Sequence, residues 1–241
     1  MLLIQFGVGA LNDRADAERD HGRAHKPIAS GIVSPTAALV IAAGAFAIGL
    51  ALAAGVSVAA LAVALAGGTV GIVYDIFLKG TAWSWLGFAV GLPLLPVFAW
   101  VGAAGDLPGP IVVAAVCAVP AGLSLAVANA LPDLERDRAA GVDSVATGLG
   151  APIAWRLGVL ADAVVVAAAC GSFVAFGGAE SSIGGLALIG LAGSAVIIVL
   201  GLLLGRDAST RRRQRGWELQ TIGTGLLAAA WAAGLAAAAR I

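Results

Sequence analysis

Charged side chains are scarce in this 241-residue sequence. Asp, Glu, Lys and Arg make up 12% of it and apolar residues make up 60%, whereas a typical soluble domain carries about 25% charged residues. So few charges cannot cover a surface that faces water, which excludes an ordinary soluble globular protein. The formal net charge is zero, and no basic patch interleaved with aromatic residues is present, so we expect no nucleic-acid partner.

Cysteine is also rare, since Cys117 and Cys170 stand alone inside apolar runs. Without a CxxC pair or a Cys/His neighbour, these thiols are interpreted as packing residues rather than metal or redox groups. The first residues lack the basic segment and the cleavage site of a signal peptide, and we expect none. Abundant small residues, including 34 Gly, favour closely packed membrane helices over a β-barrel.

Long apolar stretches dominate the sequence, and crossing a bilayer takes about 20 such residues. One apolar stretch, residues 1–14, is too short to span the bilayer alone, and seven others are long enough. We therefore predict an all-α, polytopic transmembrane helix bundle that forms a single membrane-embedded domain over residues 1–241. The complete spans are expected at residues 35–54, 56–78, 84–103, 110–131, 151–175, 183–204 and 220–239.

The basic residues predict how the bundle is oriented. If every span crosses, 13 of the 14 Lys and Arg residues lie on one side and Arg240 lies on the other. The positive-inside rule makes that side cytoplasmic, as in a protein of the cell membrane. The polar loops 15–33, 132–150 and 205–219 are then cytoplasmic, and the run 211–215 is expected to meet anionic lipid head groups.

Two matching clusters of Asn and Asp follow predicted spans on that side. The first carries Asn12, Asp16 and Asp20, and the second repeats the spacing of four. On an α-helix such positions project from one face. The alternative is that these carboxylates simply face water. Two observations argue against it: the same pattern occurs twice, and the helix dipole disfavours negative charge at a helix C-terminus. The residues of the second cluster are Asn129, Asp133 and Asp137.

These side chains suit Mg²⁺, which takes one or two carboxylates together with phosphate oxygens. Basic residues near both clusters are candidates to hold the remaining oxygens of a diphosphate. An interfacial site also lets an apolar substrate tail stay in lipid. The basic candidates are Arg23, Lys26, Lys79, Arg136 and Arg138.

Taken together, four segments resemble the UbiA-type intramembrane prenyltransferase family. They are NDxxDxxxD at residues 12–20, the Lys-Pro segment at 25–31, Tyr74 with Leu78-Lys79, and the second Asp-rich stretch at 133–141 followed by 147–150. The resemblance implies nine helices with cytoplasmic loops capping a cavity. The family has further helix before its first motif, so we expect this chain to lack the first helix and part of the second.

The resemblance also implies a function, namely Mg²⁺-assisted transfer of a prenyl group from a prenyl diphosphate to an aromatic or other lipophilic acceptor. Two alternatives stay open: a transporter whose halves carry the motifs as repeats, and an inactive truncated member. By resemblance, the metal ligands are Asn12, Asp13, Asp16, Asp20, Asn129, Asp133 and Asp137. The catalytic residues are Asp16, Asp20, Asp133, Asp137 and Tyr74, and the diphosphate is held by Arg23, Lys26, Lys79 and Arg138.

Overall fold

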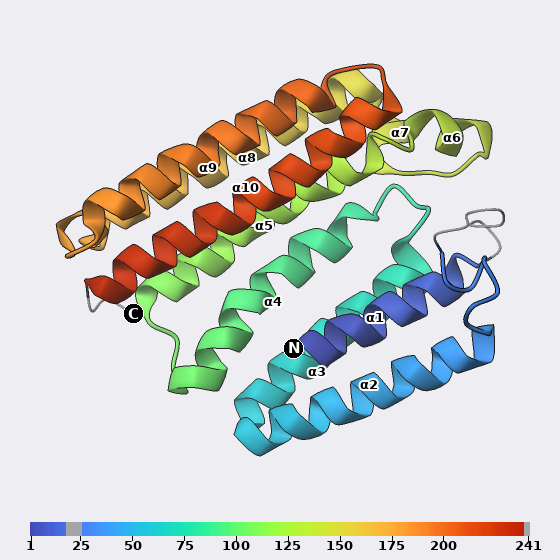
Figure 1. Cartoon of the computed structure of the whole chain (residues 1–241), viewed down its shortest axis with the longest axis horizontal. Helices are drawn as coiled ribbons and strands as arrows, with labels where there is room; N and C mark the ends of the chain where they lie inside the picture. Colours follow the sequence, from blue (N-terminus) through green and yellow to red (C-terminus); the bar gives the residue numbers. More distant parts are fainter. Residues whose placement is uncertain (18–25, 239–241) are drawn as a thin grey trace. The chain divides into compact units, whose positions relative to one another are not determined.

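The computed structural model describes residues 1–17 and 26–238, most of which are helical (Figure 1). Within these residues, seven helices are long and apolar enough to cross a membrane, which confirms the predicted transmembrane bundle. Their bounds are Pro35–Val56, Val58–Leu78, Trp85–Ala104, Gly109–Ala130, Ala151–Ala175, Gly184–Gly205 and Thr210–Ala237.

The last helix begins earlier than the sequence indicated. Helix α10 runs from Thr210 to Ala237, whereas we expected a loop over 205–219 and a span from 220. The basic side chains after Thr210 cause no break, because Arg has a high helix propensity and long side chains can reach the interface. The predicted loop 132–150 likewise contains two short helices, α6 (Leu134–Ala139) and α7 (Val145–Leu149).

The chain forms two compact units. Unit 1 comprises residues 1–79 and 94–107, and unit 2 comprises residues 80–93 and 108–241. Helix α4 (Trp85–Ala104) therefore contributes its residues up to Pro93 to unit 2 and the remainder to unit 1. The first Asn/Asp cluster belongs to unit 1 and the second belongs to unit 2.

Unit 1 is built on α1 (Leu2–Ala15), which packs against α2 (Pro35–Val56) and α3 (Val58–Val73). Ile4 is fully buried in this packing. A Cβ at Gly49 of α2 would lie 2.9 Å from the Ile4 side chain, so glycine lets these two helices approach. Ser34 and Ser57 accept backbone N–H groups at the starts of α2 and α3, which fixes where both helices begin.

Unit 2 contains α5 (Gly109–Ala130), α8 (Ala151–Ala175), α9 (Gly184–Gly205) and α10, with the short η2 turn (Gly178–Glu180) before α9. Helix α9 packs closely along α10, and α5 packs against α8 (Figure 1). At the crossing of α9 and α10 the backbones touch, because a Cβ at Gly216 would lie 2.7 Å from the Gly201 carbonyl oxygen. Small residues at such a crossing are typical of membrane helices.

Replacing Gly216 with Ala is expected to lower the free energy of unfolding by about 1–3 kcal/mol, because the added methyl group forces the two helices apart. Gly193→Ala on α9 is the matched control, since a Cβ there meets no atom within 4 Å. Reversible unfolding in mixed detergent micelles measures the difference. Equal stabilities for the two variants would contradict the close crossing.

Large apolar side chains lie exposed along the spans, among them Leu52, Val116, Leu160, Ile189 and Leu203. The buried core is instead made mostly of Ala and other small or medium apolar residues. Hydrocarbon is the solvent in which such an exposed apolar surface is stable. The protein is therefore an integral membrane protein.

Candidate active site

The first cluster lies at the end of α1. Asn12 and Asp13 stand in its last turn, and Asp16 is its C-cap residue, whose N–H donates to the Asn12 carbonyl oxygen at 2.9 Å. The helix therefore stops one residue before Asp16, and the expected continuous helical face ends there. The predicted site residues Asp20 and Arg23 lie outside the described residues.

A π-helical turn, η1 (Tyr74–Leu78), supplies the other side of the first cluster. It is closed by the bond from the Lys79 N–H to the Tyr74 carbonyl oxygen, 2.8 Å long. The hydrogen-bonded loop of a π-turn contains one more residue than that of an α-helix, and such turns recur at functional sites. Here it follows α3 directly and contacts α1, so Asp75 and Lys79 reach the end of α1.

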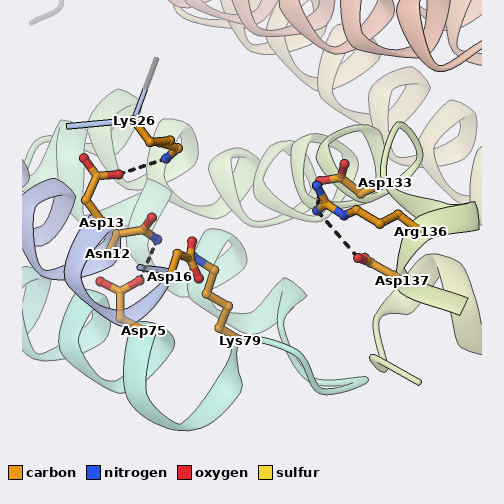
Figure 2. A network of polar contacts seen from close by, with 9 residues as sticks. All are labelled: Asn12, Asp13, Asp16, Lys26, Asp75, Lys79, Asp133, Arg136 and Asp137. Carbon is orange, nitrogen blue, oxygen red and sulfur yellow. Dashed lines mark hydrogen bonds and ion pairs between the residues drawn. The ribbon is translucent and has the colours of Figure 1, made fainter. Parts of the chain in front are cut away.

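Three polar contacts join the residues of the first cluster (Figure 2). The Asn12 side-chain amide donates to Asp75 Oδ1 at 2.8 Å. The Lys79 ammonium group donates to Asp16 Oδ2, and the Lys26 ammonium group lies 2.8 Å from Asp13 Oδ1. Five residues predicted from the sequence take part in these contacts within unit 1, namely Asn12, Asp13, Asp16, Lys26 and Lys79.

Asp75 is the residue that the predicted site lacked. It is only 6% exposed, and its Oδ2 atom is buried without a hydrogen-bond partner in the described part of the chain. A buried carboxylate oxygen without a partner is costly unless another group satisfies it. The sequence did contain a signal for Asp75 as a site residue, because it is a carboxylate inside an apolar run, four residues before Lys79.

A cavity of about 500 Å³ opens beside the first cluster within unit 1. Asn12 and Asp13 contribute its polar atoms together with Gln5, and most of its other walls are apolar. Phe6 of α1, Ile41 of α2 and Ile28 of the connecting segment are among these apolar walls. The walls of the cavity therefore include both a carboxylate and an apolar surface that can contact a hydrocarbon chain.

The second cluster does not share one helix, which corrects the expectation of a single helical face. Helix α5 ends at Ala130, and a turn over 131–133 separates Asn129 from Asp137 of α6. Pro132 is the reason, because it has no N–H to donate and its ring clashes with the carbonyl four residues earlier. Asp133 then precedes α6, and its carbonyl oxygen accepts the Asp137 N–H at 2.8 Å.

One guanidinium group joins the two carboxylates of the second cluster (Figure 2). Arg136 lies 2.9 Å from Asp133 Oδ2 and 3.7 Å from Asp137 Oδ1. Arg138 points to a different carboxylate and lies 3.5 Å from Glu135. Two acidic side chains thus converge here, with exposed basic groups next to them.

Arg213 anchors the turn that carries this cluster, a role that could not be predicted from the sequence. We expected the run 211–215 to meet lipid head groups, yet Arg213 is 6% exposed. Its guanidinium group donates to the Leu131 carbonyl oxygen at 3.1 Å and to the Asp207 carbonyl oxygen at 2.7 Å. It therefore ties the end of α5 to the connection between α9 and α10.

Next to the turn over 131–133, buried apolar side chains hold α6 and α7 against α5 and α8. Leu131, Leu134 and Ala146 belong to one buried core cluster. Ser144 and Thr147 cap α7 reciprocally, with the Ser144 N–H donating to Thr147 Oγ1 at 2.7 Å. The second cluster is thus held by short helices that pack on α5 and α8, rather than by an extended loop.

The oxygen ligands of the two clusters suit a divalent ion only together with a phosphorylated ligand. Within the described residues of either unit, no three His, Cys, Asp or Glu side chains are grouped to hold a metal ion by themselves. Mg²⁺ needs only one or two carboxylates when phosphate oxygens complete its shell. Both clusters offer such carboxylates, and the partnerless Asp75 oxygen adds another in unit 1. The residues therefore fit Mg²⁺ that arrives with a phosphorylated ligand.

Asp162 belongs to neither cluster. It lies within α8 at 3% exposure, beside Ser124 of α5, and both residues are buried in unit 2. This carboxyl group sits between two packed helices in the membrane-spanning region.

Known proteins resemble this chain both in sequence and in fold. The sequence pattern of the UbiA prenyltransferase family matches residues 1–222. A digeranylgeranylglyceryl phosphate synthase from Methanopyrus kandleri is 30% identical over 159 residues, which are 64% of this chain and 57% of that protein. The match therefore spans little more than half of that relative's length.

Solved structures show the same fold. The apo structure of a UbiA homologue from Aeropyrum pernix K1 superposes with a TM-score of 0.76 at 20% identity, over 95% of this chain and 84% of that one. A UbiA homologue from Archaeoglobus fulgidus, bound to GPP and Mg²⁺, gives a TM-score of 0.67 at 18% identity over 95% and 83%.

Proposed function

Because the chain belongs to the UbiA prenyltransferase family, we propose that it transfers a prenyl group from a prenyl diphosphate to an aromatic or other lipophilic acceptor. The observation that carries this proposal is the pairing of two carboxylates around η1, where Asp16 binds the Lys79 ammonium group and Asp75 binds the Asn12 amide. The Archaeoglobus fulgidus homologue with GPP and Mg²⁺ supports the choice of substrate and ion.

In this proposal the metal ions are held by two sets of oxygen ligands. Mg²⁺, when bound, neutralises the diphosphate and stabilises the charge that develops on it as the C–O bond breaks. Asn12, Asp13, Asp16 and Asp20 provide one set, and Asn129, Asp133 and Asp137 provide the other. Asp75 orients the Asn12 amide through their 2.8 Å hydrogen bond.

The basic residues hold the diphosphate. Lys26 and Lys79 are paired with Asp13 and Asp16, and all four side chains are between 15% and 29% exposed. A flexible ammonium group with access to water exchanges a carboxylate for a phosphate oxygen at little cost. Arg138, with its side chain 50% exposed, and Arg23 act in the same way. The carboxylates released from these pairs are then available to the metal.

Tyr74 is proposed to lie near the reacting carbon, at the first position of η1. When the allylic C–O bond breaks, its electron pair leaves with the diphosphate and positive charge develops on the prenyl group. The face of an aromatic ring stabilises such a charge. The acceptor then attacks the allylic carbon and loses a proton, which completes the transfer.

We propose further that residues 1–241 act as one membrane-embedded domain and that both clusters serve the same reaction. We also propose that the clusters lie on the cytoplasmic side of the cell membrane, because the basic residues near them follow the positive-inside rule. One relative is a digeranylgeranylglyceryl phosphate synthase, so a glycerol phosphate lipid belongs in an acceptor screen beside aromatic compounds.

Binding of geranyl diphosphate by the purified protein is expected to require Mg²⁺. Chelation with excess EDTA should weaken it at least about tenfold, because uncompensated carboxylates then repel the diphosphate. Geraniol is the matched control ligand, since it lacks the diphosphate and should be insensitive to EDTA.

Equally tight binding of geranyl diphosphate with and without EDTA would remove the basis of the proposed mechanism. Turnover separates the enzyme from the transporter alternative. An enzyme releases diphosphate and a prenylated product, whereas a transporter in sealed vesicles moves its substrate without chemical change.

A further inference from the structure

A second cavity lies in unit 2, at the start of α8 and the connection between α9 and α10. Its volume is about 360 Å³. Four of its lining residues are Trp155, Arg156, Arg206 and Arg213, and the others are Ala, Pro and Gly residues. We call this cavity the arginine pocket. Its lining contains no carboxylate, and although Arg213 lies 3.5 Å from Glu135, Arg156 and Arg206 give the pocket a positive character.

Two side chains of the arginine pocket are held in place. The Trp155 indole N–H donates to the Leu202 carbonyl oxygen at 2.8 Å, which fixes the ring against α9. The Arg206 guanidinium carbon then lies 5.6 Å from the centre of that ring. This cation–π contact positions the positive charge of Arg206 without neutralising it.

The positive charges of Arg156 and Arg206 are not neutralised by carboxylates. In the part of the chain that the structure describes, neither forms an ion pair, and both side chains are exposed. Asp207 follows Arg206 directly, but its carboxylate binds the Ser209 N–H and Arg212, each at 2.8 Å. The Ser209 N–H and Arg212 also lower the pKa of Asp207, so it remains ionised and engaged.

The start of α8 adds to the positive potential. This 25-residue helix begins at Ala151, has no side-chain cap and carries no acidic residue in its first turn. The first N–H groups of such a helix carry partial positive charge and suit an anion. Ala151 and Pro152 line the pocket, so this helix end and the guanidinium groups border the same space.

We propose that the arginine pocket binds the phosphate group of an anionic phospholipid. Arg156 and Arg206 hold the phosphate oxygens, while the Ala and Pro walls contact the glycerol part of the lipid. The pocket joins α8, α9 and α10, so a bound lipid links the three helices. Arg213 lines the pocket and also binds the Leu131 carbonyl oxygen, which connects the site to the second cluster. The proposal does not depend on prenyl transfer.

Native mass spectrometry of the full chain in a non-ionic detergent, titrated with dihexanoyl phosphatidylglycerol, tests this site. The double variant Arg156→Gln/Arg206→Gln should bind this lipid on the order of tenfold more weakly than the unchanged protein. The matched control is Arg211→Gln/Arg215→Gln, which removes two exposed basic charges that do not line the pocket. It should change the affinity by less than about twofold.

Equal losses in the two double variants would overturn the pocket in favour of diffuse attraction to basic residues. Equal binding of dihexanoyl phosphatidylcholine, whose choline group is repelled by the arginines, would also overturn it. Inorganic phosphate is the third ligand and distinguishes the source of the phosphate. Weaker binding than that of the lipid supports a phospholipid, and equal binding overturns the lipid in favour of free phosphate.

Discussion

Replacing Asp133 with Asn should lower the turnover of prenyl transfer by about 10²- to 10³-fold, and Asp16→Asn should do the same. The amide keeps the shape of the side chain but removes the charge that binds Mg²⁺ and balances the ionising diphosphate. Because the two residues lie in different clusters, a similar loss from each indicates that both clusters serve one reaction. Single-turnover formation of prenylated product measures the effect.

Asp143→Asn is the matched control for this pair of substitutions. Asp143 is exposed and belongs to the same connection as Asp133, so its replacement removes an equal charge without touching either cluster. Its turnover should stay within about twofold of the unchanged protein. Thermal unfolding of all three variants should remain cooperative, because the Asn amide keeps the size and shape of each replaced side chain. Full activity in both Asp16→Asn and Asp133→Asn would refute the assignment of the site.

The spans could be predicted from the sequence because hydropathy depends on local composition. Residues 84–103 were expected to cross, and α4 occupies Trp85–Ala104. The start of α10 was missed for the same reason, since the arginines after Thr210 lower the hydropathy without breaking the helix. Hydropathy reports which residues tolerate lipid, whereas the helix continues as far as its backbone hydrogen bonds do.

Spacing alone could not predict the geometry of the clusters. The regular spacing of four suggested one helical face twice, but Pro132 breaks the second helix and Asp16 ends the first. The π-turn at Tyr74–Leu78 leaves no mark in the hydrophobic pattern. Arg213 looked like one member of a basic run, and only the packing of α10 on α9 shows that it is buried.

Asp75→Leu is the second substitution with a large expected effect, because Asp75 is buried and bonded to a proposed metal ligand. Loss of the hydrogen bond from Asn12 to Asp75 leaves the Asn12 amide without its orienting partner. Removing such a supporting partner typically costs about 10- to 100-fold in metal affinity or activity. We expect the Mg²⁺ concentration for half-maximal turnover to rise by that factor, as measured by titration of product formation with Mg²⁺.

The conservative change Asp75→Asn separates orientation from charge, since its side-chain oxygen still accepts the Asn12 amide. It should restore most of the Mg²⁺ affinity lost in Asp75→Leu. Asp162→Leu is the matched control, because Asp162 is equally buried within a span but lies outside both clusters. It should alter thermal stability and leave the Mg²⁺ half-saturation unchanged. If all three variants shift that half-saturation alike, Asp75 acts through general packing rather than through Asn12.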